Sequence, residues 1–223
     1  MAILLGIDGT GPKTDEAYQK KFQNNFVNKI VRDSSINPEN KKYLRGPTFI
    51  GSGLIHSIDT GFRFVIERYS ITKEPILLTG FSRGAAGVIV IAEKLRKRQI
   101  PVTAMLLFDA IGRHLLVNAK TIPENVETVL HLRRDPTVGS REMFGNTGTK
   151  WNPPTIYEEE FFFCTHGGVG GRPGSVEFGL SDLPIKESFP DGLTKITFNE
   201  DTEGSKKVWQ KAQTFIEKHG FFG

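Results

Sequence analysis

The sequence has a single cysteine, Cys164, and no long apolar run. One thiol cannot form a disulfide within the chain, so a disulfide-stapled secreted scaffold is excluded. No apolar run reaches the ~18 residues that a membrane-spanning helix needs, so we expect no transmembrane segment, although peripheral membrane contact is compatible with the sequence. The first residues lack the basic leader and apolar core of a signal peptide. We therefore expect a cytoplasmic protein, with signal-independent export left open.

The sequence also lacks a strong excess of either charge. It has 29 lysines and arginines against 25 aspartates and glutamates, a formal net charge of +4. The basic residues are scattered and lack the interleaved aromatic residues of nucleic-acid-binding surfaces, so we expect no nucleic-acid partner. A hydrophobic fraction of 38% over 223 residues suits a globular protein. This length predicts a single domain over residues 1–223.

The segment 80–84 reads Gly-Phe-Ser-Arg-Gly and follows the apolar run 76–78, and a helical pattern of apolar residues comes after it. A strand, a sharp turn with a serine between glycines and a helix are the context of a nucleophile elbow, in which the turn lifts the serine hydroxyl above the sheet. The N–H of Arg83 would then lie at a helix N-terminus, where a developing negative charge is favoured. The pattern predicts Ser82 as a nucleophile.

Five apolar runs alternate with helical patterns or long connections. They cover residues 3–8, 76–78, 102–108, 126–132 and 160–165. This alternation predicts an α/β fold with a doubly wound, mainly parallel sheet of about five or more strands, compact and α/β-hydrolase-like. The last run contains three consecutive phenylalanines, which predict a buried strand. No convincing strand is visible between the helical patterns 17–31 and 55–69.

Two stretches, 136–159 and 172–202, show few periodic positions and many glycines and prolines. We expect both to be irregular, and to serve as lid or pocket loops. A terminal helix is expected after the second stretch, where apolar residues recur at helical spacing from Val208 onwards.

In a parallel sheet the loops after the strands meet at the carboxyl edge, where ligands bind. Ser82, Asp109 and His166 each follow a predicted strand. A serine hydroxyl needs a base, and an imidazole in a glycine-rich loop, such as His166, can accept its proton. The carboxylate that orients the imidazole can be Asp109 or Asp135, because Asp135 ends the next strand. The other four histidines fall within helical patterns or near strand ends and are weaker candidates.

An oxyanion hole needs a second donor from an early strand-to-helix loop, in addition to the N–H of Arg83. The first predicted strand runs into Asp8-Gly9-Thr10-Gly11. We therefore expect the backbone N–H groups of Gly9 and Thr10 to complete the oxyanion hole.

Four segments together resemble one family, the phospholipase effectors of type VI secretion and their uncharacterised relatives. They are Ile-Asp-Gly-Thr-Gly at 7–11, Gly-Phe-Ser-Arg-Gly-Ala at 80–85, Phe-Asp-Ala-Ile-Gly at 108–112 and His-Gly-Gly-Val-Gly-Gly at 166–171. The resemblance implies an α/β-hydrolase with Asp109 as the triad acid and a phospholipid or other lipid ester as substrate. The family usually has an acidic residue two places after the histidine, where this chain has Gly168.

These features predict a serine esterase of the lipase type, which cleaves a carboxylic ester through a Ser-His-Asp triad and an acyl-enzyme, without a metal or cofactor. Two alternatives stay open. The loop 6–11, Gly-Ile-Asp-Gly-Thr-Gly, could hold a phosphate in a kinase or ATPase, although no Walker lysine accompanies it. The chain could also be a non-catalytic binding member of the fold.

Overall fold

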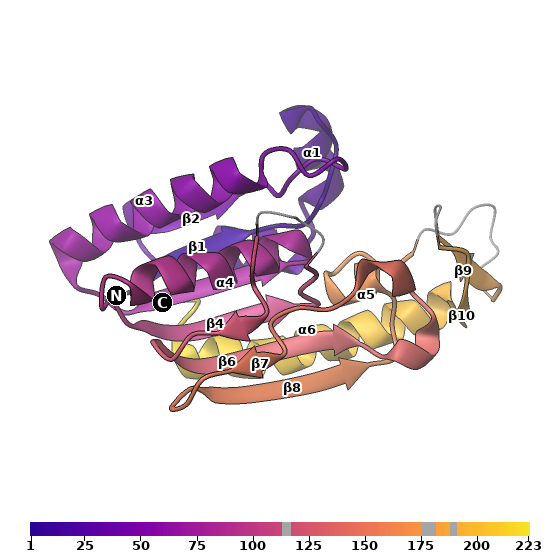
Figure 1. The fold of residues 1–223 in the computed structure, drawn as a ribbon. Coiled ribbons are helices and arrows are strands. Elements are labelled where there is room, and N and C mark those ends of the chain that lie inside the picture. The colour runs from indigo at the N-terminus through magenta and orange to yellow at the C-terminus, as the bar shows by residue number, and fades with distance from the viewer. Residues whose placement is uncertain (113–116, 175–181, 188–190) are drawn as a thin grey trace.

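The computed structural model describes residues 1–223 except 113–116, 175–181 and 188–190. Its central sheet has six strands in the order β2-β1-β3-β4-β6-β8, and every pair of neighbours is parallel. These strands are β1 (Ile3–Ile7), β2 (Lys41–Leu44), β3 (Ile76–Phe81), β4 (Val102–Phe108), β6 (Val126–Arg134) and β8 (Ile156–Phe162). Helices lie on both faces of the sheet (Figure 1), so the predicted doubly wound α/β fold is confirmed.

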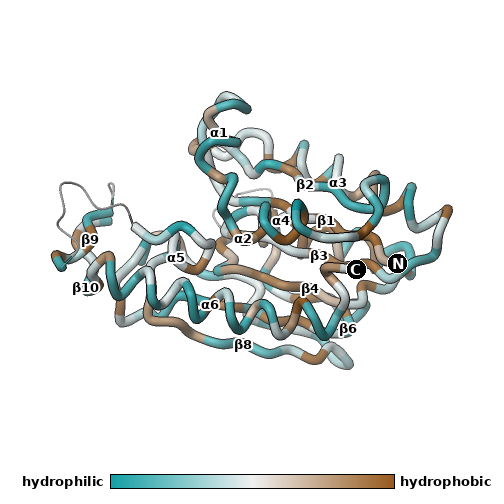
Figure 2. The backbone as a smooth tube through the Cα atoms, turned by 180° about the vertical axis from the view of Figure 1, so that it is seen from behind, coloured by the Kyte–Doolittle hydropathy of each residue, from teal (hydrophilic) through white to brown (hydrophobic). Residues whose placement is uncertain are grey.

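The helices divide between the two faces of the sheet. They are α1 (Asp15–Phe22), α2 (Phe26–Asp33), α3 (Leu54–Thr72), α4 (Arg83–Arg96), α5 (His166–Val169) and α6 (Phe198–His219), with short 3₁₀ turns η1 (Pro38–Asn40), η2 (Pro136–Val138) and η3 (Glu142–Phe144). Helices α3 and α4 cover one face, and α2 and α6 cover the other, which Figure 2 shows from behind.

Two small pairs of strands lie outside the central sheet. Strand β5 (Thr121–Ile122) pairs in parallel with β7 (Lys150–Trp151), and β9 (Pro184–Lys186) pairs antiparallel with β10 (Leu193–Thr197). The β9–β10 pair lies beyond the carboxyl ends of the central strands, near α5 (Figure 1). Both chain termini lie at the opposite end of the sheet.

The two faces of the sheet carry separate apolar clusters because strand side chains alternate in direction. In β1, Ile3, Leu5 and Ile7 pack with α3 and α4, and Leu4 packs with α2 and α6. All five residues of β1 are buried. A parallel sheet covered on both faces explains why its central strands are continuous apolar runs in the sequence.

The structure corrects two expectations about strands. Strand β2, Lys-Lys-Tyr-Leu, is not predicted from the sequence. It lies at the sheet edge and its four residues are only half-buried, so it has no apolar run that would indicate a strand. The strand expected at 160–165 begins earlier, at Ile156, and is mostly exposed rather than buried. It is the other edge strand, and Glu158 and Glu159 in it are exposed. Edge strands lack the apolar signature of central strands, so the sequence pattern was misleading at both edges.

The two stretches expected to be irregular contain regular elements. Residues 136–159 include η2, η3, β7 and the start of β8, and residues 172–202 include β9, β10 and the first turn of α6. Helix α6 begins at Phe198, where Thr197 and Glu200 form a capping box. A threonine followed three residues later by glutamate is a helix-start signal that the sequence does contain.

Candidate active site

Ser82 lies on a sharp turn between β3 and α4. Its backbone has a φ of 58° and a ψ of −127°, which is strained for a residue with a side chain. Gly80 makes the turn possible, because a Cβ there would approach the Cα of Ala85 at 2.6 Å. The N–H of Ser82 donates to the carbonyl of Phe108 at 3.0 Å, which ties the turn to the end of β4. The predicted strand, turn and helix are all present.

Gly84 is required by close packing of α4 against the end of β1. A Cβ at this position would collide with the carbonyl oxygens of Ile7 and Asp8. We expect Gly84→Ala to lower the free energy of unfolding by about 3 kcal/mol or more, because backbone atoms cannot yield as side chains do. Chemical denaturation monitored by circular dichroism measures this change.

Gly87, one helical turn further along α4, is the matched control. A Cβ there would meet only side-chain atoms, those of Leu54 and Ile58 at 3.4 Å and of Ile7 at 3.6 Å, which are ordinary contacts. Gly87→Ala is expected to stabilise the protein by about 0.5–1 kcal/mol, since alanine favours the helix. Equal effects of the two substitutions would contradict the packing described here.

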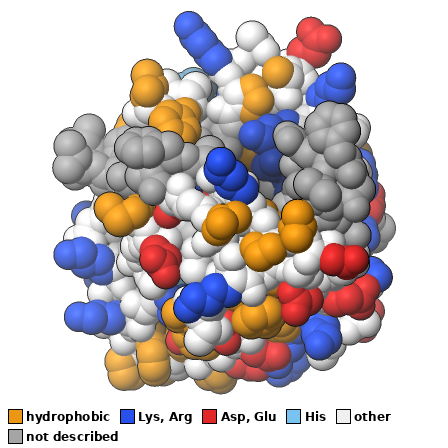
Figure 3. Space-filling view, turned by 90° about the vertical axis from the view of Figure 1, so that its right-hand side faces the viewer, with side chains coloured by type: hydrophobic (Ala, Val, Ile, Leu, Met, Phe, Trp, Pro, Cys, Tyr) orange, Lys and Arg blue, Asp and Glu red, His pale blue; other side chains and the backbone are white. Residues whose placement is uncertain are grey.

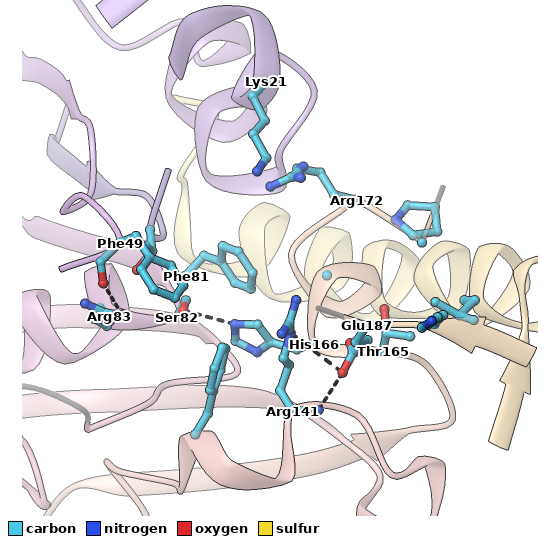
Figure 4. Close-up of a pocket in the computed structure, with 17 residues that line it drawn as sticks. Lys21, Phe49, Phe81, Ser82, Arg83, Arg141, Thr165, His166, Arg172 and Glu187 are labelled. Atoms are coloured by element: carbon cyan, nitrogen blue, oxygen red, sulfur yellow. Dashed lines mark hydrogen bonds and ion pairs between the residues drawn. The ribbon is translucent and has the colours of Figure 1, made fainter. Parts of the chain in front are cut away.

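Ser82, His166 and Asp109 form a continuous series of hydrogen bonds. The Nε2 of His166 lies 3.0 Å from the Oγ of Ser82, and its Nδ1 lies 2.6 Å from Oδ2 of Asp109. Figure 4 shows the imidazole pointing at the serine hydroxyl. The imidazole stacks on Phe81, with ring centroids 4.8 Å apart, and meets the edge of Phe144 at 5.5 Å. The two aromatic rings restrict the orientation of the imidazole.

Asp109 is fully buried just after β4, in a left-handed conformation with a φ of 44°. Burial alone would raise its pKa, but the hydrogen bond to His166 and the charge of Arg134 lower the pKa to about 2. Arg134 donates from Nη1 to Oδ2 of Asp109 and from Nε to the carbonyl of Ser140 at 2.8 Å. Asp135 instead accepts from its neighbour Thr137 at the surface. Of the two candidate acids, Asp109 alone contacts the imidazole.

The backbone around His166 is held by side chains that the sequence did not single out. The N–H of His166 donates to Oγ of Ser140 at 2.9 Å, and Thr165 caps the short helix α5 by accepting from Gly168 N–H at 2.9 Å. Asp201 of α6 accepts from the N–H and the hydroxyl of Thr165, at 2.6 and 2.8 Å. A Cβ at Gly168 would collide with Asp201. The carboxylate of Asp201 in α6 therefore occupies the space beside position 168.

His131 supports the turn that carries Asp109. Its Nε2 accepts from the N–H of Ala110 at 3.1 Å, which puts the ring proton on Nδ1, 3.1 Å from the hydroxyl of Tyr157. Burial, followed by the charge of Arg133, lowers the pKa of His131 to about 4. This imidazole is therefore neutral at pH 7, and it serves as an acceptor for the backbone.

The remaining histidines lie away from Ser82 or outside the described residues. His56 is exposed in α3 and His219 ends α6, as the helical patterns indicated. His114 falls in the segment 113–116, which the structure does not describe.

Asp8 is the first residue after β1, and its side chain is buried. It accepts from Gly9 N–H at 2.8 Å, from the amide of Asn25 at 2.7 Å and from the hydroxyl of Tyr43 at 3.0 Å. Burial raises the pKa of Asp8 to about 6 despite these hydrogen bonds. The N–H of Gly9, expected in the oxyanion hole, is thus bonded to Asp8. The hydroxyl of Thr10 is buried without a partner among the described residues.

The same loop bears on the alternative of a phosphate-binding site. The N–H of Gly11 donates to the carbonyl of Pro47 at 3.0 Å, and the hydroxyl of Tyr18 donates to the carbonyl of Gly9 at 2.5 Å. A phosphate cradle needs successive backbone N–H groups that face the ligand. The N–H groups of Gly9 and Gly11 both donate to acceptors within the protein, so the loop does not present a row of N–H groups to a phosphate.

A cavity of about 410 Å³ opens at the carboxyl edge of the sheet. Ser82 and His166 line it together with Thr10 and Arg83, and its apolar lining includes Phe49. Ser82 and the loop that follows β1 therefore border the same space. The expected convergence of the loops after β1, β3, β4 and β8 at this edge is confirmed.

Two further searches concern only the described part of the chain. No group of three or more His, Cys, Asp or Glu side chains is arranged to hold a metal ion among residues 1–112, 117–174, 182–187 and 191–223. Over the same residues, no helix has both the length and the apolar character to cross a bilayer.

No protein-family model matches the chain, and no curated protein matches its sequence. Solved structures resemble it in architecture. A protein described as a YdeN-like hydrolase, from Pectobacterium atrosepticum, has a TM-score of 0.45 and 11% identity, over 93% of this chain and 92% of that one. An uncharacterized Pseudomonas aeruginosa protein has a TM-score of 0.46 and 12% identity, over 95% of this chain and 45% of that one. The type II thioesterase BorB has a TM-score of 0.38 and 10% identity, over 74% and 83%. These likenesses concern the fold alone.

Proposed function

We propose that this protein is a serine hydrolase that cleaves a carboxylic ester through an acyl-enzyme. The observation that carries the proposal is the buried series of hydrogen bonds from Ser82 through His166 to Asp109. A nucleophile, a base and an orienting carboxylate within hydrogen-bonding distance are the arrangement that activates a serine hydroxyl.

Each member has a defined role in the proposed reaction. His166 removes the proton of Ser82 through Nε2 as the Oγ attacks the ester carbonyl, and then gives that proton to the leaving alcohol. Water, deprotonated by the same Nε2, hydrolyses the acyl-serine and restores the free hydroxyl. Asp109, with a pKa of about 2, is ionised at neutral pH and stabilises the imidazolium that forms on Nδ1. Arg134 fixes the carboxylate of Asp109 for this task.

The oxyanion of the tetrahedral intermediate needs at least two donors. We assign this role to the backbone N–H groups of Thr10 and Arg83, which both line the cavity beside Ser82. Arg83 begins α4, and the N-terminus of a helix favours a developing negative charge. Gly9 was expected to contribute its N–H, but that group donates to Asp8. In this proposal Gly9 acts by allowing the loop to approach Phe81 closely.

The substrate proposed is an ester of small or moderate size, and a lipid ester is consistent with the apolar groups at the cavity. Phe49 lines the cavity and is 74% exposed, and the next residue, Ile50, is 88% exposed. The resemblance to phospholipase effectors supports a lipid ester on independent grounds. A cavity of about 410 Å³ suits a short acyl chain better than a whole long-chain lipid.

Labelling with a fluorophosphonate tests the proposal, since this reagent reacts with activated serines. We expect a single adduct, located by peptide mass spectrometry at Ser82, together with turnover of 4-nitrophenyl butyrate. Heat-unfolded protein is the control and should not react. Absence of both labelling and turnover in the folded protein would favour a non-catalytic role.

A further inference from the structure

Basic side chains gather around the cavity that contains Ser82. Five of its lining residues are basic and one is acidic: Lys21, Arg83, Arg141, Arg172 and Lys186, against Glu187. Figure 3 looks onto this end of the molecule, where lysine and arginine side chains lie close to the hollow in the middle of the face. The net charge of the whole chain is only +4, so this concentration is local.

Lys21 and Arg172 point toward each other across the mouth of the cavity (Figure 4). Lys21 comes from the last turn of α1, and Arg172 from the segment after α5. Neither forms an ion pair with a carboxylate of the described residues. Glu187 is already engaged, because it accepts from Arg141 N–H at 2.8 Å.

The position of Arg172 is fixed relative to the triad. Its backbone N–H donates to the carbonyl of Gly167, next to His166, at 2.8 Å. Its guanidinium lies over the ring of Phe22, 4.7 Å from the ring centroid. A cation held in this way loses little freedom when it binds a ligand, which favours binding.

The two cations also repel each other. Lys21 is exposed, but partial desolvation of its ammonium group lowers its pKa, and the charges of Arg172 and Arg141 lower it further. Burial likewise lowers the pKa of Arg172, although the carboxylate of Asp8 acts in the opposite direction. An anion between Lys21 and Arg172 would relieve this repulsion and would make charge-assisted hydrogen bonds to both.

We infer that Lys21 and Arg172 form an anion subsite that holds a carboxylate or phosphate group of the ester substrate. The inference rests on the proposed function and narrows its substrate class to esters that carry a negative charge. A planar guanidinium beside a mobile ammonium suits either anion, because both present several oxygens in a small volume. The anion lies either on the acid part or on the alcohol part of the ester.

Two matched pairs of substrates test the inference and distinguish these sources. The acid part is tested by comparing kcat/KM for 4-nitrophenyl hemisuccinate and 4-nitrophenyl butyrate, which share acyl length and leaving group. The alcohol part is tested by comparing 2-phosphoethyl butyrate and ethyl butyrate. In at least one pair, we expect the anionic ester to be preferred by about 10- to 100-fold, as charge-assisted hydrogen bonds require. The preference should fall as salt is raised.

Substitutions show which residues cause the preference for anionic over neutral esters. Lys21→Met should reduce it several-fold, and the double variant Lys21→Met, Arg172→Met should remove most of it. Lys20→Met is the matched control, because Lys20 precedes Lys21 in α1, is exposed and does not line the cavity. Lys21 is exposed as well, so its substitution is expected to leave the fold intact. A preference that persists unchanged in Lys21→Met and in the double variant would overturn the inference.

The anion subsite and the esterase proposal can fail separately. Turnover of the neutral esters without a preference in either pair would remove the subsite and leave the esterase. If no ester is turned over, isothermal titration calorimetry with inorganic phosphate still tests whether Lys21 and Arg172 bind an anion. At least tenfold weaker phosphate binding in the double variant than in wild type and Lys20→Met would support the subsite. Equal binding in all three proteins, or none in wild type, would overturn it.

Discussion

Replacement of Ser82 with alanine is expected to lower kcat for ester hydrolysis by about 10⁴- to 10⁶-fold, because the attacking oxygen is removed. The residual rate would come from the oxyanion donors and from substrate binding. Alanine keeps the backbone N–H that bonds to Phe108, so the fold should be retained. Turnover of 4-nitrophenyl butyrate, measured at high enzyme concentration, gives the ratio of kcat values.

His166→Ala should lower kcat by a similar factor, and the double variant should be no slower than either single variant, because the two residues act as one unit. Ser70→Ala is the control for loss of a hydroxyl, since Ser70 is exposed in α3 and its hydroxyl donates to the carbonyl of Glu67 in the same helix. Additive losses in the double variant would mean that Ser82 and His166 do not act on the same step.

Asp109→Asn is expected to lower kcat by about 10³- to 10⁴-fold, while Asp135→Asn should change it by less than about twofold. The asparagine loses the charge that stabilises the imidazolium and can hold the wrong imidazole tautomer. It also leaves the buried guanidinium of Arg134 without its carboxylate. Asp135 is a suitable control because it is the other acid that the sequence allowed. The reverse order of effects would exclude Asp109 as the orienting acid.

The pKa of Asp109 adds a pH dependence to this prediction. Its value in the folded protein, about 2, is lower than the ordinary 3.8 of the unfolded chain. The charge of Asp109 therefore stabilises the fold fully above pH 3.8, and this contribution is lost as pH falls toward 2. Between pH 4 and pH 9, activity should not respond to ionisation of Asp109. Asp109→Asn should weaken the loss of stability below pH 4, as denaturant unfolding at pH 3 and pH 6 would measure.

Most of the fold could be predicted because the central strands are signalled locally. The strands β1, β3 and β4 are buried on both faces along almost their whole length and are mainly apolar. Strand β6 is buried from Val129 onwards and is apolar in its first part except for Glu127 and Thr128. The edge strands β2 and β8 are only partly covered by the rest of the protein. Both therefore contain charged residues and lack a continuous apolar run. Strand pairing at an edge depends on a neighbouring strand that is distant in sequence, and composition does not report it.

Some residues of the candidate site could likewise be predicted from local sequence signals, and others could not. Ser82 could be found because its turn leaves glycines and a helical pattern beside it, and His166 because it follows a strand. Arg134, Ser140 and Asp201 contact Asp109, His166 and Thr165 respectively, and they carry no local signal. Arg134 is next to Asp135 in the sequence, yet it is Arg134 that reaches the site.

The sequence by itself determined the order of the central strands along the chain, the sharp turn at Ser82 and the edge of the sheet at which the polar loop residues gather. Local sterics and the period of apolar residues are sufficient for that, because they act between neighbours in the chain. The tertiary structure alone decided which aspartate contacts His166 and where Lys21 points toward Arg172. Asp109 and His166 are 57 positions apart, and Lys21 and Arg172 are 151 positions apart, so each pair comes together only when the helices and strands have packed.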